Sequence, residues 1–211
     1  MEIYLLRHGQ TEMNTMHCLQ GHTDTVLNDT GIQQAKALHD FLEEKQISFD
    51  TVFVSPLKRV IQTAELVTGK NPKNFIVEPR LIEMSFGINE GKKLSDLPDE
   101  FFHNFFENPT LYEPPEGAES YFSALHRVHA MLMDIKEDNK NGFYDNKRIL
   151  LASHGAISHC IVHLFSDDEF KDLWEVTIDN CALIKLDFAN YTYEFIHPGF
   201  SRPRYNPNQS K

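Results

Sequence analysis

The sequence predicts an α/β protein with three layers, in which helices cover both faces of a mostly parallel central sheet. Short apolar runs alternate along the chain with longer segments whose apolar residues recur every three or four positions. Two of these apolar runs end in His-Gly, at His8-Gly9 and His154-Gly155. The chain has 211 residues, of which 41% are hydrophobic, so a sizeable core and one large domain are expected.

The predicted strands are short apolar runs bounded by glycine, proline or polar residues, and they cover 3–6, 51–54, 75–77 and 148–153. Two antiparallel edge strands are predicted at 181–188 and 191–196, joined by a tight turn. A helix is predicted over 30–46, opened by a capping-box pattern at Thr30. A second helix follows Ser55-Pro56, with the serine as N-cap and the proline at the first helical position, and ends at Gly69.

A long helix is predicted after residue 120, with one apolar face formed by Phe122, Leu125, His129, Leu132 and Ile135. A last helix follows Gly155. Between these regions, residues 84–117 lose regular periodicity and are predicted to form a part-helical insertion that lies over another part of the molecule as a lid. Its aromatic residues are interpreted as a small local core in preference to a substrate platform. The expected domain covers 1–200, and 201–211 is predicted to be a polar, loose tail.

Residues suited to phosphate chemistry follow three of the predicted strands. Arg7 and His8 come directly after the first strand. Arg59 follows the second, and His154 follows the fourth. Because ligands bind at the carboxyl ends of strands in open parallel sheets, we expect these side chains to converge. Arginines can hold the oxygens of a dianionic phosphoryl group while an imidazole accepts the phosphorus, and Gly9 is expected to let the backbone turn sharply beside the anion.

Charge and hydropathy restrict the partners. The 31 acidic and 20 basic residues give a formal net charge of -11, which repels polyanions, so no nucleic-acid or membrane partner is expected. A small phosphate ester still suits a pocket in which positive charge is concentrated. No apolar stretch is long enough to cross a bilayer and the N-terminal run lacks the basic start of a secretory signal, so a cytoplasmic location is the default expectation. The oligomeric state is left open, with a homodimer among the alternatives.

Other phosphate chemistries lack the residues that they need. Cys18, Cys160 and Cys181 are odd in number and show no Cys-x-x-Cys spacing, which favours reduced thiols over disulfides or a zinc site. No arginine follows Cys18 or Cys160 at the short distance that a cysteine-dependent phosphatase requires. A Gly-rich loop ending in Lys-Ser or Lys-Thr is missing, and no cluster of carboxylates and histidines indicates a two-metal centre.

Four motifs, in this order, resemble the histidine phosphatase superfamily, also called phosphoglycerate mutase-like. They are Leu6-Arg7-His8-Gly9-Gln10-Thr11-Glu12-Met13-Asn14, Ser55-Pro56-Leu57-Lys58-Arg59-Val60-Ile61-Gln62-Thr63-Ala64, Arg80-Leu81-Ile82-Glu83-Met84-Ser85-Phe86-Gly87 and Ser153-His154-Gly155. The segment after the first motif is also similar, at Gln20-Gly21, Asp24, Leu27 and Gly31. The resemblance covers residues 1 to 165 and implies the phosphoglycerate mutase-like fold.

The resemblance implies roles for the motif residues. His8 would accept the phosphoryl group, and Glu83 would be the general acid and then the base. The phosphoryl oxygens would be held by Arg7, Arg59 and His154. The substrate-binding residues would be Arg7, Asn14, Gln20, Gly21, Arg59, Glu83, His154 and Gly155. Hydrolysis in this family needs no metal and no organic cofactor, so none is expected.

The choice of acid and of reaction rests on the insertion. Glu83 competes for the role of acid with Glu90, Asp96, Glu116 and Glu119. The resemblance implies that mutases carry basic residues in the insertion and the tail that grip a second anionic group, whereas 94–119 is acidic and aromatic and contains no arginine. We therefore expect a phosphomonoesterase acting on small phosphorylated metabolites. A cofactor-dependent phosphoglycerate mutase is the alternative enzyme, and an inactive member that binds phospho-ligands or proteins is the alternative outside enzymes.

Overall fold

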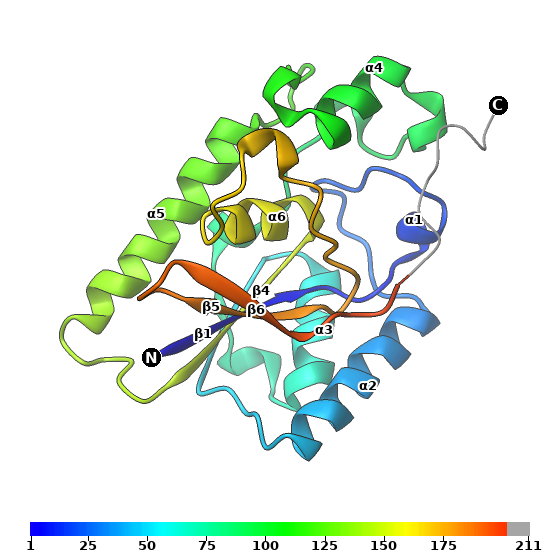
Figure 1. Cartoon of the computed structure of the whole chain (residues 1–211). Helices are drawn as coiled ribbons and strands as arrows, with labels where there is room; N and C mark the ends of the chain where they lie inside the picture. The colour runs from blue at the N-terminus through cyan, green and yellow to red at the C-terminus, as the bar shows by residue number, and fades with distance from the viewer. Residues whose placement is uncertain (202–211) are drawn as a thin grey trace.

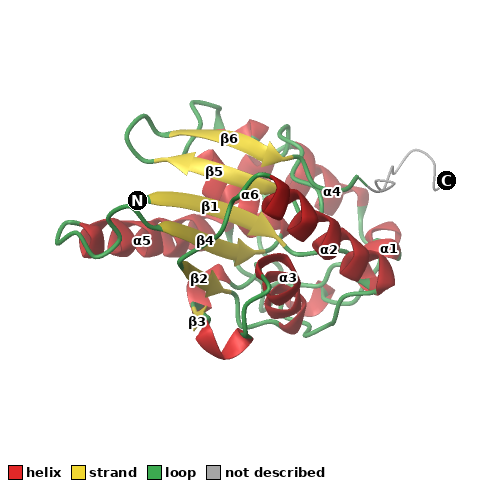
Figure 2. Cartoon of the chain, turned by 90° about the horizontal axis from the view of Figure 1, so that it is seen from below, coloured by secondary structure: helices red, strands yellow, loops and turns green. Residues whose placement is uncertain are grey.

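A six-stranded sheet forms the centre of the computed structural model, which describes residues 1–201. The strands are β1 (Glu2–Arg7), β2 (Thr51–Val54), β3 (Ile76–Val77), β4 (Arg148–Ser153), β5 (Leu183–Asp187) and β6 (Thr192–His197). Their order across the sheet is β3-β2-β4-β1-β5-β6, which Figure 2 shows. The first four are parallel to one another, and β5 is antiparallel to both of its neighbours. The prediction of a mostly parallel sheet is confirmed.

Helices cover both faces of this sheet, which confirms the three-layer arrangement. On one face lie α2 (Asp29–Glu44) and α3 (Lys58–Thr68), and on the other α5 (Tyr121–Asn139) and α6 (Gly155–His163), as Figures 1 and 2 show. Shorter helices are α1 (Glu12–Thr15), α4 (Asp99–Phe102), η1 (Pro72–Asn74), η2 (Pro79–Leu81), η3 (Gly87–Asn89), η4 (Leu94–Asp96), η5 (His103–Glu107), η6 (Pro109–Leu111) and η7 (Phe170–Asp172).

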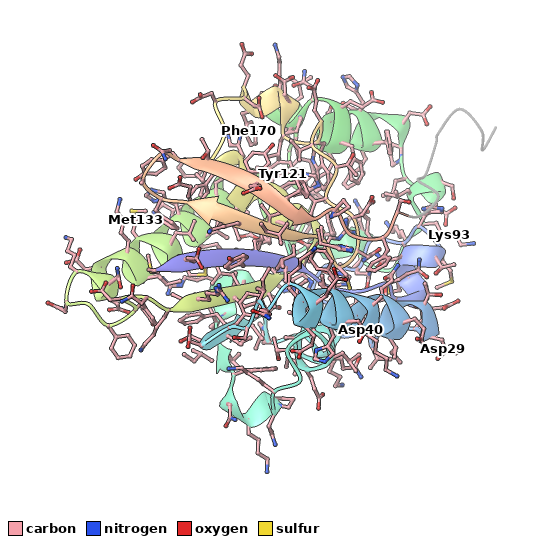
Figure 3. The ribbon with its side chains drawn as sticks, turned by 60° about the horizontal axis from the view of Figure 1, so that its bottom comes forward. Asp29, Asp40, Lys93, Tyr121, Met133 and Phe170 are labelled. Atoms are coloured by element: carbon pink, nitrogen blue, oxygen red, sulfur yellow. The ribbon has the colours of Figure 1, made fainter. Side chains whose placement is uncertain are left out.

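The sheet separates two hydrophobic cores because successive side chains of a strand point to opposite faces. In β1, Ile3 and Leu5 belong to the core beneath α5 and α6. Tyr4 and Leu6 belong to the core beneath α2 and α3, and β4 alternates in the same way. Exposed carboxylates such as Asp29 and Asp40 lie on the outer side of α2 (Figure 3). Because β1 and β4 are buried on both faces, each of them forms a continuous apolar run in the sequence.

The starts of two helices differ from the sequence predictions. α2 is capped by Asn28, whose side chain accepts a hydrogen bond from the Gly31 N–H at 2.9 Å, so the capping box predicted at Thr30 is wrong. Asparagine is as good an N-cap as threonine, and it lies two residues earlier. α3 begins at Lys58 with Leu57 as N-cap, and the hydroxyl of Ser55 instead contacts a buried histidine ring. The predicted helix end at Gly69 is confirmed, with φ of +64°.

The structure also differs from the predicted buried face of the long helix and from the prediction of two edge strands. The buried face of α5 is formed by Tyr121, Ala124, Val128, Met131, Leu132 and Ile135. Phe122 is 81% exposed, and His129 is also exposed. The face of the helix that begins one residue earlier, at Tyr121, has the same three- and four-residue spacing. That face contains no histidine, so it is the one that is buried. β5 is not an edge strand, since it pairs with β1 on one side and β6 on the other.

Residues 84–117, which the sequence predicts to be an insertion, contain the short helices η3, η4, α4, η5 and η6. One of its turns, His103–Glu107, is a π-helix. The predicted tail lies outside the described residues, apart from Ser201. No helix within residues 1–201 combines the length and the apolar character needed to cross a membrane.

Candidate active site

Strand register brings the predicted site residues together. Arg7 at the end of β1 pairs with Ser153 at the end of β4, and Val54 at the end of β2 pairs with Ala152. The residues that follow these strands therefore leave the sheet at one edge. The rings of His8 and His154 lie 5.3 Å apart between centroids. The expected convergence of the strand ends is confirmed.

A cavity of about 400 Å³ opens at this edge. Among the residues lining it are eight of the predicted site residues, namely Arg7, His8, Asn14, Gln20, Gly21, Arg59, Glu83 and Gly155. His154 is the ninth, and it is fully buried behind the wall and not on it. Most of the apolar side chains on the wall come from the insertion and from the segment after α6.

His8 is held in one orientation by its neighbours. Its Nδ1 lies 2.7 Å from the carbonyl oxygen of Gly9, which can only accept, so Nδ1 carries the proton. In the neutral ring the lone pair is then on Nε2. The carbonyl of His8 accepts a hydrogen bond from the side chain of Asn180 at 2.9 Å, and the backbone N–H of Cys181 donates to the Arg7 carbonyl at 3.1 Å. The chain around 180 therefore fixes the backbone of both residues.

Arg59 is a buried cation at the inner end of the cavity. Its Nη1 and Nη2 donate to the carbonyl oxygens of Thr23 and Gly21 at 2.7 and 2.8 Å, and its Nε donates to Nδ1 of His154 at 3.2 Å. Burial lowers the pKa of Arg59 to about 10, so it is still charged at neutral pH. A guanidinium has five N–H donors, and these three contacts leave two for an anion.

His154 has a defined tautomer for the same reason. Since Nδ1 accepts from Arg59, the proton of the neutral ring is on Nε2, which donates to Oγ of Ser55 at 2.6 Å. Burial, followed by the charge of Arg59, holds the pKa of His154 well below its usual range. The ring is therefore neutral, and both of its nitrogens already have partners. His154 is placed to orient Arg59.

Glu83 and Arg7 both lie close to Gly155. A Cβ added at Gly155 would be 3.4 Å from Nη2 of Arg7 and 3.6 Å from Oε2 of Glu83. Glu83 is only 7% exposed, and its carboxyl group accepts from the backbone N–H groups of Ala156 and Ile157, each at 3.2 Å, at the start of α6. The guanidinium of Arg7 donates to the carbonyl of Ile178. Both groups are thus held at the cavity by backbone contacts.

The competing carboxylates have structural contacts elsewhere. Glu90 accepts from the backbone N–H groups of His22 at 3.0 Å and Phe86 at 3.2 Å, and so fixes the loop beside Gly21. Glu119 forms a two-point ion pair with Arg127, at 2.8 and 2.9 Å. Asp96 and Glu116 are exposed, and none of the four lines the cavity. Glu83 is the candidate acid that the geometry retains.

The structure bears on the predictions made for Gly9 and for the three cysteines. Gly9 has no positive φ. It is required because a Cβ there would lie 2.8 Å from the carbonyl oxygen of Gly31, so the close approach that the structure shows is to backbone. The cysteines are free thiols, as predicted, and burial raises the pKa of each, to about 12 for Cys181. Within residues 1–201, no three His, Cys, Asp or Glu side chains are grouped to hold a metal ion.

Sequence reasoning missed four residues that shape the site. Ser55 and Asn180 contact His154 and His8, and Thr63 accepts from the Gly9 N–H at 3.0 Å. Trp174 lines the cavity although it is far from every motif. Ser55 and Thr63 belong to the second motif and could have been suspected from it, whereas no local pattern marks Trp174 or Asn180.

The profile of the histidine phosphatase superfamily, branch 1, matches residues 3–199. The chain belongs to this superfamily. This chain is 32% identical to "Putative phosphoserine phosphatase 2" of Hydrogenobacter thermophilus over 188 residues, which is 87% of this chain and 88% of that protein. It is 28% identical to "Probable phosphoglycerate mutase GpmB" of Photorhabdus laumondii over 190 residues, covering 90% and 86% of the two chains.

The fold of this chain matches that of solved structures. YhfR of Bacillus stearothermophilus superposes with a TM-score of 0.79 at 25% sequence identity, covering 95% of this chain and 98% of that one. The predicted phosphoglycerate mutase-like fold is confirmed. Relatives named as phosphatases and as mutases both match, so the residues of this chain's own cavity distinguish the two reactions.

Proposed function

We propose that this protein is a phosphomonoesterase that hydrolyses small phosphate esters through a phosphohistidine on His8. The observation that carries the proposal is the placement of Arg7, His8, Arg59 and Glu83 on the wall of one cavity. Both arginines are positioned by hydrogen bonds to carbonyl oxygens, and His8 has the tautomer that a nucleophile requires. Charge stabilisation by positioned cations is the main requirement of phosphoryl transfer.

The proposed reaction has two steps. Nε2 of His8 forms a bond to phosphorus while the bond from phosphorus to the ester oxygen breaks, and the leaving alkoxide takes a proton from the Glu83 carboxyl group. The Glu83 carboxylate then takes a proton from a water molecule that attacks the phosphohistidine, which releases inorganic phosphate and restores both side chains. Arg7 and Arg59 hold the phosphoryl oxygens, and His154 keeps Arg59 in position. No metal ion is needed, because the two guanidinium groups supply the positive charge.

A mutase is the second candidate, because a relative carries that name. A mutase must bind an ester with a second anionic group and return its phosphoryl group before water reacts. Within residues 1–201, the cavity wall contains no lysine, and its arginines are the two assigned to the phosphoryl group. Hydrolysis is therefore favoured, since a second anion has no further guanidinium or ammonium to bind.

The experiment follows p-nitrophenyl phosphate hydrolysis with and without excess EDTA, and in parallel the interconversion of 2- and 3-phosphoglycerate primed by the bisphosphate. We expect hydrolysis at the same rate with and without EDTA and slow interconversion. Rapid interconversion with little release of phosphate would assign the chain as a mutase. Loss of hydrolysis in EDTA, restored by a divalent cation, would contradict the metal-free mechanism.

A further inference from the structure

One side of the cavity is an aromatic wall with no role in the proposed phosphoryl-transfer steps. Its aromatic members are Phe86, Phe102, Phe105 and Phe106 of the insertion and Trp174 of the segment after α6, and Val176 lies on the same wall. Phe106 and Trp174 pack edge to face with centroids 4.9 Å apart, and Phe102 lies 5.0 Å from Phe106. The sequence interpretation of these rings as a local core is correct for Phe105, which is fully buried, but Phe102 and Phe106 are only partly buried.

A buried hydrogen-bond chain holds this aromatic wall in place. Nε1 of Trp174 donates to the hydroxyl of Tyr121 at 2.8 Å, and that hydroxyl donates to the Phe105 carbonyl at 2.9 Å. Tyr121 is 3% exposed, and its ring packs edge to face on Phe170 at 5.6 Å; Figure 3 labels both residues. One tyrosine of α5 thus ties the insertion to the segment after α6. The wall is formed before a ligand arrives, which reduces the entropic cost of binding.

The π-helical turn His103–Glu107 explains how the insertion presents its rings. π-helical turns are rare and occur frequently at functional sites. Phe105, Phe106 and Glu107 are consecutive residues of this turn and all three line the cavity, although Phe105 is fully buried. The irregular turn therefore serves the cavity as well as the local packing.

The charges on the wall disfavour an alcohol that carries a carboxylate. Glu107 and Asp179 both line the cavity, and within residues 1–201 the lining arginines are Arg7 and Arg59, with no lysine. His159 also contributes to the polar lining, and its Nδ1 lies 3.1 Å from the Leu173 carbonyl oxygen. A carboxylate on the alcohol would face two like charges, whereas an apolar alcohol would gain the burial of its surface.

We infer that the substrate of this site is a phosphate monoester of an apolar alcohol, aryl or aliphatic, without a carboxylate or a second phosphate. This inference rests on the proposed phosphomonoesterase function and specifies its substrate class. The phosphoryl group lies against the arginines, and the alcohol lies against Phe102, Phe106 and Trp174. A cavity of about 400 Å³ is in the size range of small-molecule sites and accommodates a phosphate with one ring.

The test compares three primary alkyl esters, ethyl phosphate, 2-phenylethyl phosphate and 2-carboxyethyl phosphate, whose leaving groups are similar in basicity. We expect kcat/KM of the phenylethyl ester to exceed that of the ethyl ester by roughly 10- to 100-fold, and that of the carboxyethyl ester to be the lowest of the three. Equal values, or a preference for the carboxyethyl ester, would overturn the inference and leave the phosphatase assignment intact. No hydrolysis of any ester would instead overturn the phosphatase assignment.

A matched pair of variants locates the preference. Phe106→Ala is expected to reduce the phenylethyl-to-ethyl ratio by roughly tenfold, because it removes one face of the subsite. Phe122→Ala makes the same substitution at a ring of α5 that is 81% exposed and outside the cavity, and it is expected to keep the wild-type ratio. An unchanged ratio in a folded Phe106→Ala protein would overturn the placement of the alcohol.

A second measurement needs no variant. The inhibition constants of ethylphosphonate and 2-phenylethylphosphonate on the wild-type enzyme compare the same two groups in molecules that cannot be hydrolysed. The phenylethyl compound is expected to inhibit at a roughly 10- to 100-fold lower concentration. Equal inhibition constants would contradict an apolar alcohol subsite even if Phe106→Ala failed to fold.

Discussion

A single backbone contact prepares His8 as a nucleophile. The Gly9 carbonyl, 2.7 Å from Nδ1, keeps the proton on that nitrogen and leaves Nε2 with its lone pair. The carbonyl of His8 is in turn bound by Asn180, so the ring and its backbone are both positioned. Attack on phosphorus by Nε2 makes this residue the carrier of the phosphoryl group in the proposed reaction.

Replacing His8 by alanine is therefore expected to remove the covalent intermediate. Acid-quenched wild-type enzyme, mixed with a phosphoryl-labelled substrate, should carry acid-labile label, and His8→Ala should carry none and lose roughly 10³-fold or more in kcat. His126→Ala, at an exposed histidine of α5, should carry as much label as the wild type. Full activity in His8→Ala would exclude the proposed nucleophile.

The role of Glu83 can be separated from simple binding by varying the leaving group. An alkoxide is a poor leaving group and needs a proton, whereas p-nitrophenolate leaves without one. Glu83→Gln is expected to reduce kcat on an alkyl phosphate by roughly 10²- to 10⁴-fold, and to reduce it less on p-nitrophenyl phosphate. Glu116→Gln, at an exposed carboxylate outside the cavity, is the matched control. Equal losses on both substrates would indicate a binding role, and no loss would move the acid to another carboxylate.

Among the elements, α6 connects the sheet to the chemistry. Its first residue, Gly155, leaves the space between Arg7 and Glu83 open, and its next two N–H groups bind the Glu83 carboxyl group. The segment after α6 contributes Ile178 to Arg7 and Trp174 to the aromatic wall. The same stretch of chain thus positions groups of the phosphoryl side and of the alcohol side.

Gly155→Ala should separate activity from stability. Alanine is a better helix residue than glycine, and the nearest atom to the added methyl group would be Nη2 of Arg7 at 3.4 Å, so the midpoint of thermal unfolding should not fall. The methyl group would nevertheless occupy space between Arg7 and Glu83. We expect kcat/KM to fall roughly tenfold or more on every phosphate ester, as for other small displacements at a reacting centre. Wild-type kinetics in this variant would show that substrate does not enter the space beside Gly155.

For the whole molecule, buried histidines link stability to pH. The folded pKa of His154 is well below its unfolded value of 6.5, because burial and Arg59 oppose the charged ring. Below pH 6.5 the unfolded chain takes up a proton that the folded chain does not, so stability is complete above this pH and decreases as the pH falls. His163 and His197 shift in the same direction through burial.

Urea unfolding between pH 7.5 and 5 should therefore show a free energy of unfolding that decreases below pH 6.5, by up to about 1.4 kcal/mol per pH unit for His154. Carboxylates with lowered pKa values, such as Glu78, lose their stabilising charge only at more acidic pH. An NMR titration in the same range should show the His154 ring remaining neutral. A normal titration of that ring near pH 6.5 would contradict the buried arrangement.

The amino-acid sequence was enough to predict the fold class, the strands of the sheet and eight of the residues that line the cavity. Continuous apolar runs identify strands buried on both faces, and the residue after such a strand is delivered to the sheet edge whatever the rest of the chain does. For this reason the amino-acid pattern alone places Arg7, His8 and Arg59 at one edge of the sheet. The family motifs added Glu83, Asn14 and the other lining residues, which no periodicity marks.

Which of these groups are in contact depends on how distant segments pack together. Ser55 was predicted as a helix cap, but a buried histidine nitrogen needs a partner, and the register of β2 and β4 brings His154 to it. The exposed position of Phe122 follows from which of two equivalent helical stripes meets the core. Trp174 reaches the cavity because Tyr121, on a distant helix, binds its indole nitrogen. Such contacts join residues that are far apart in the chain, so no local sequence pattern predicts them.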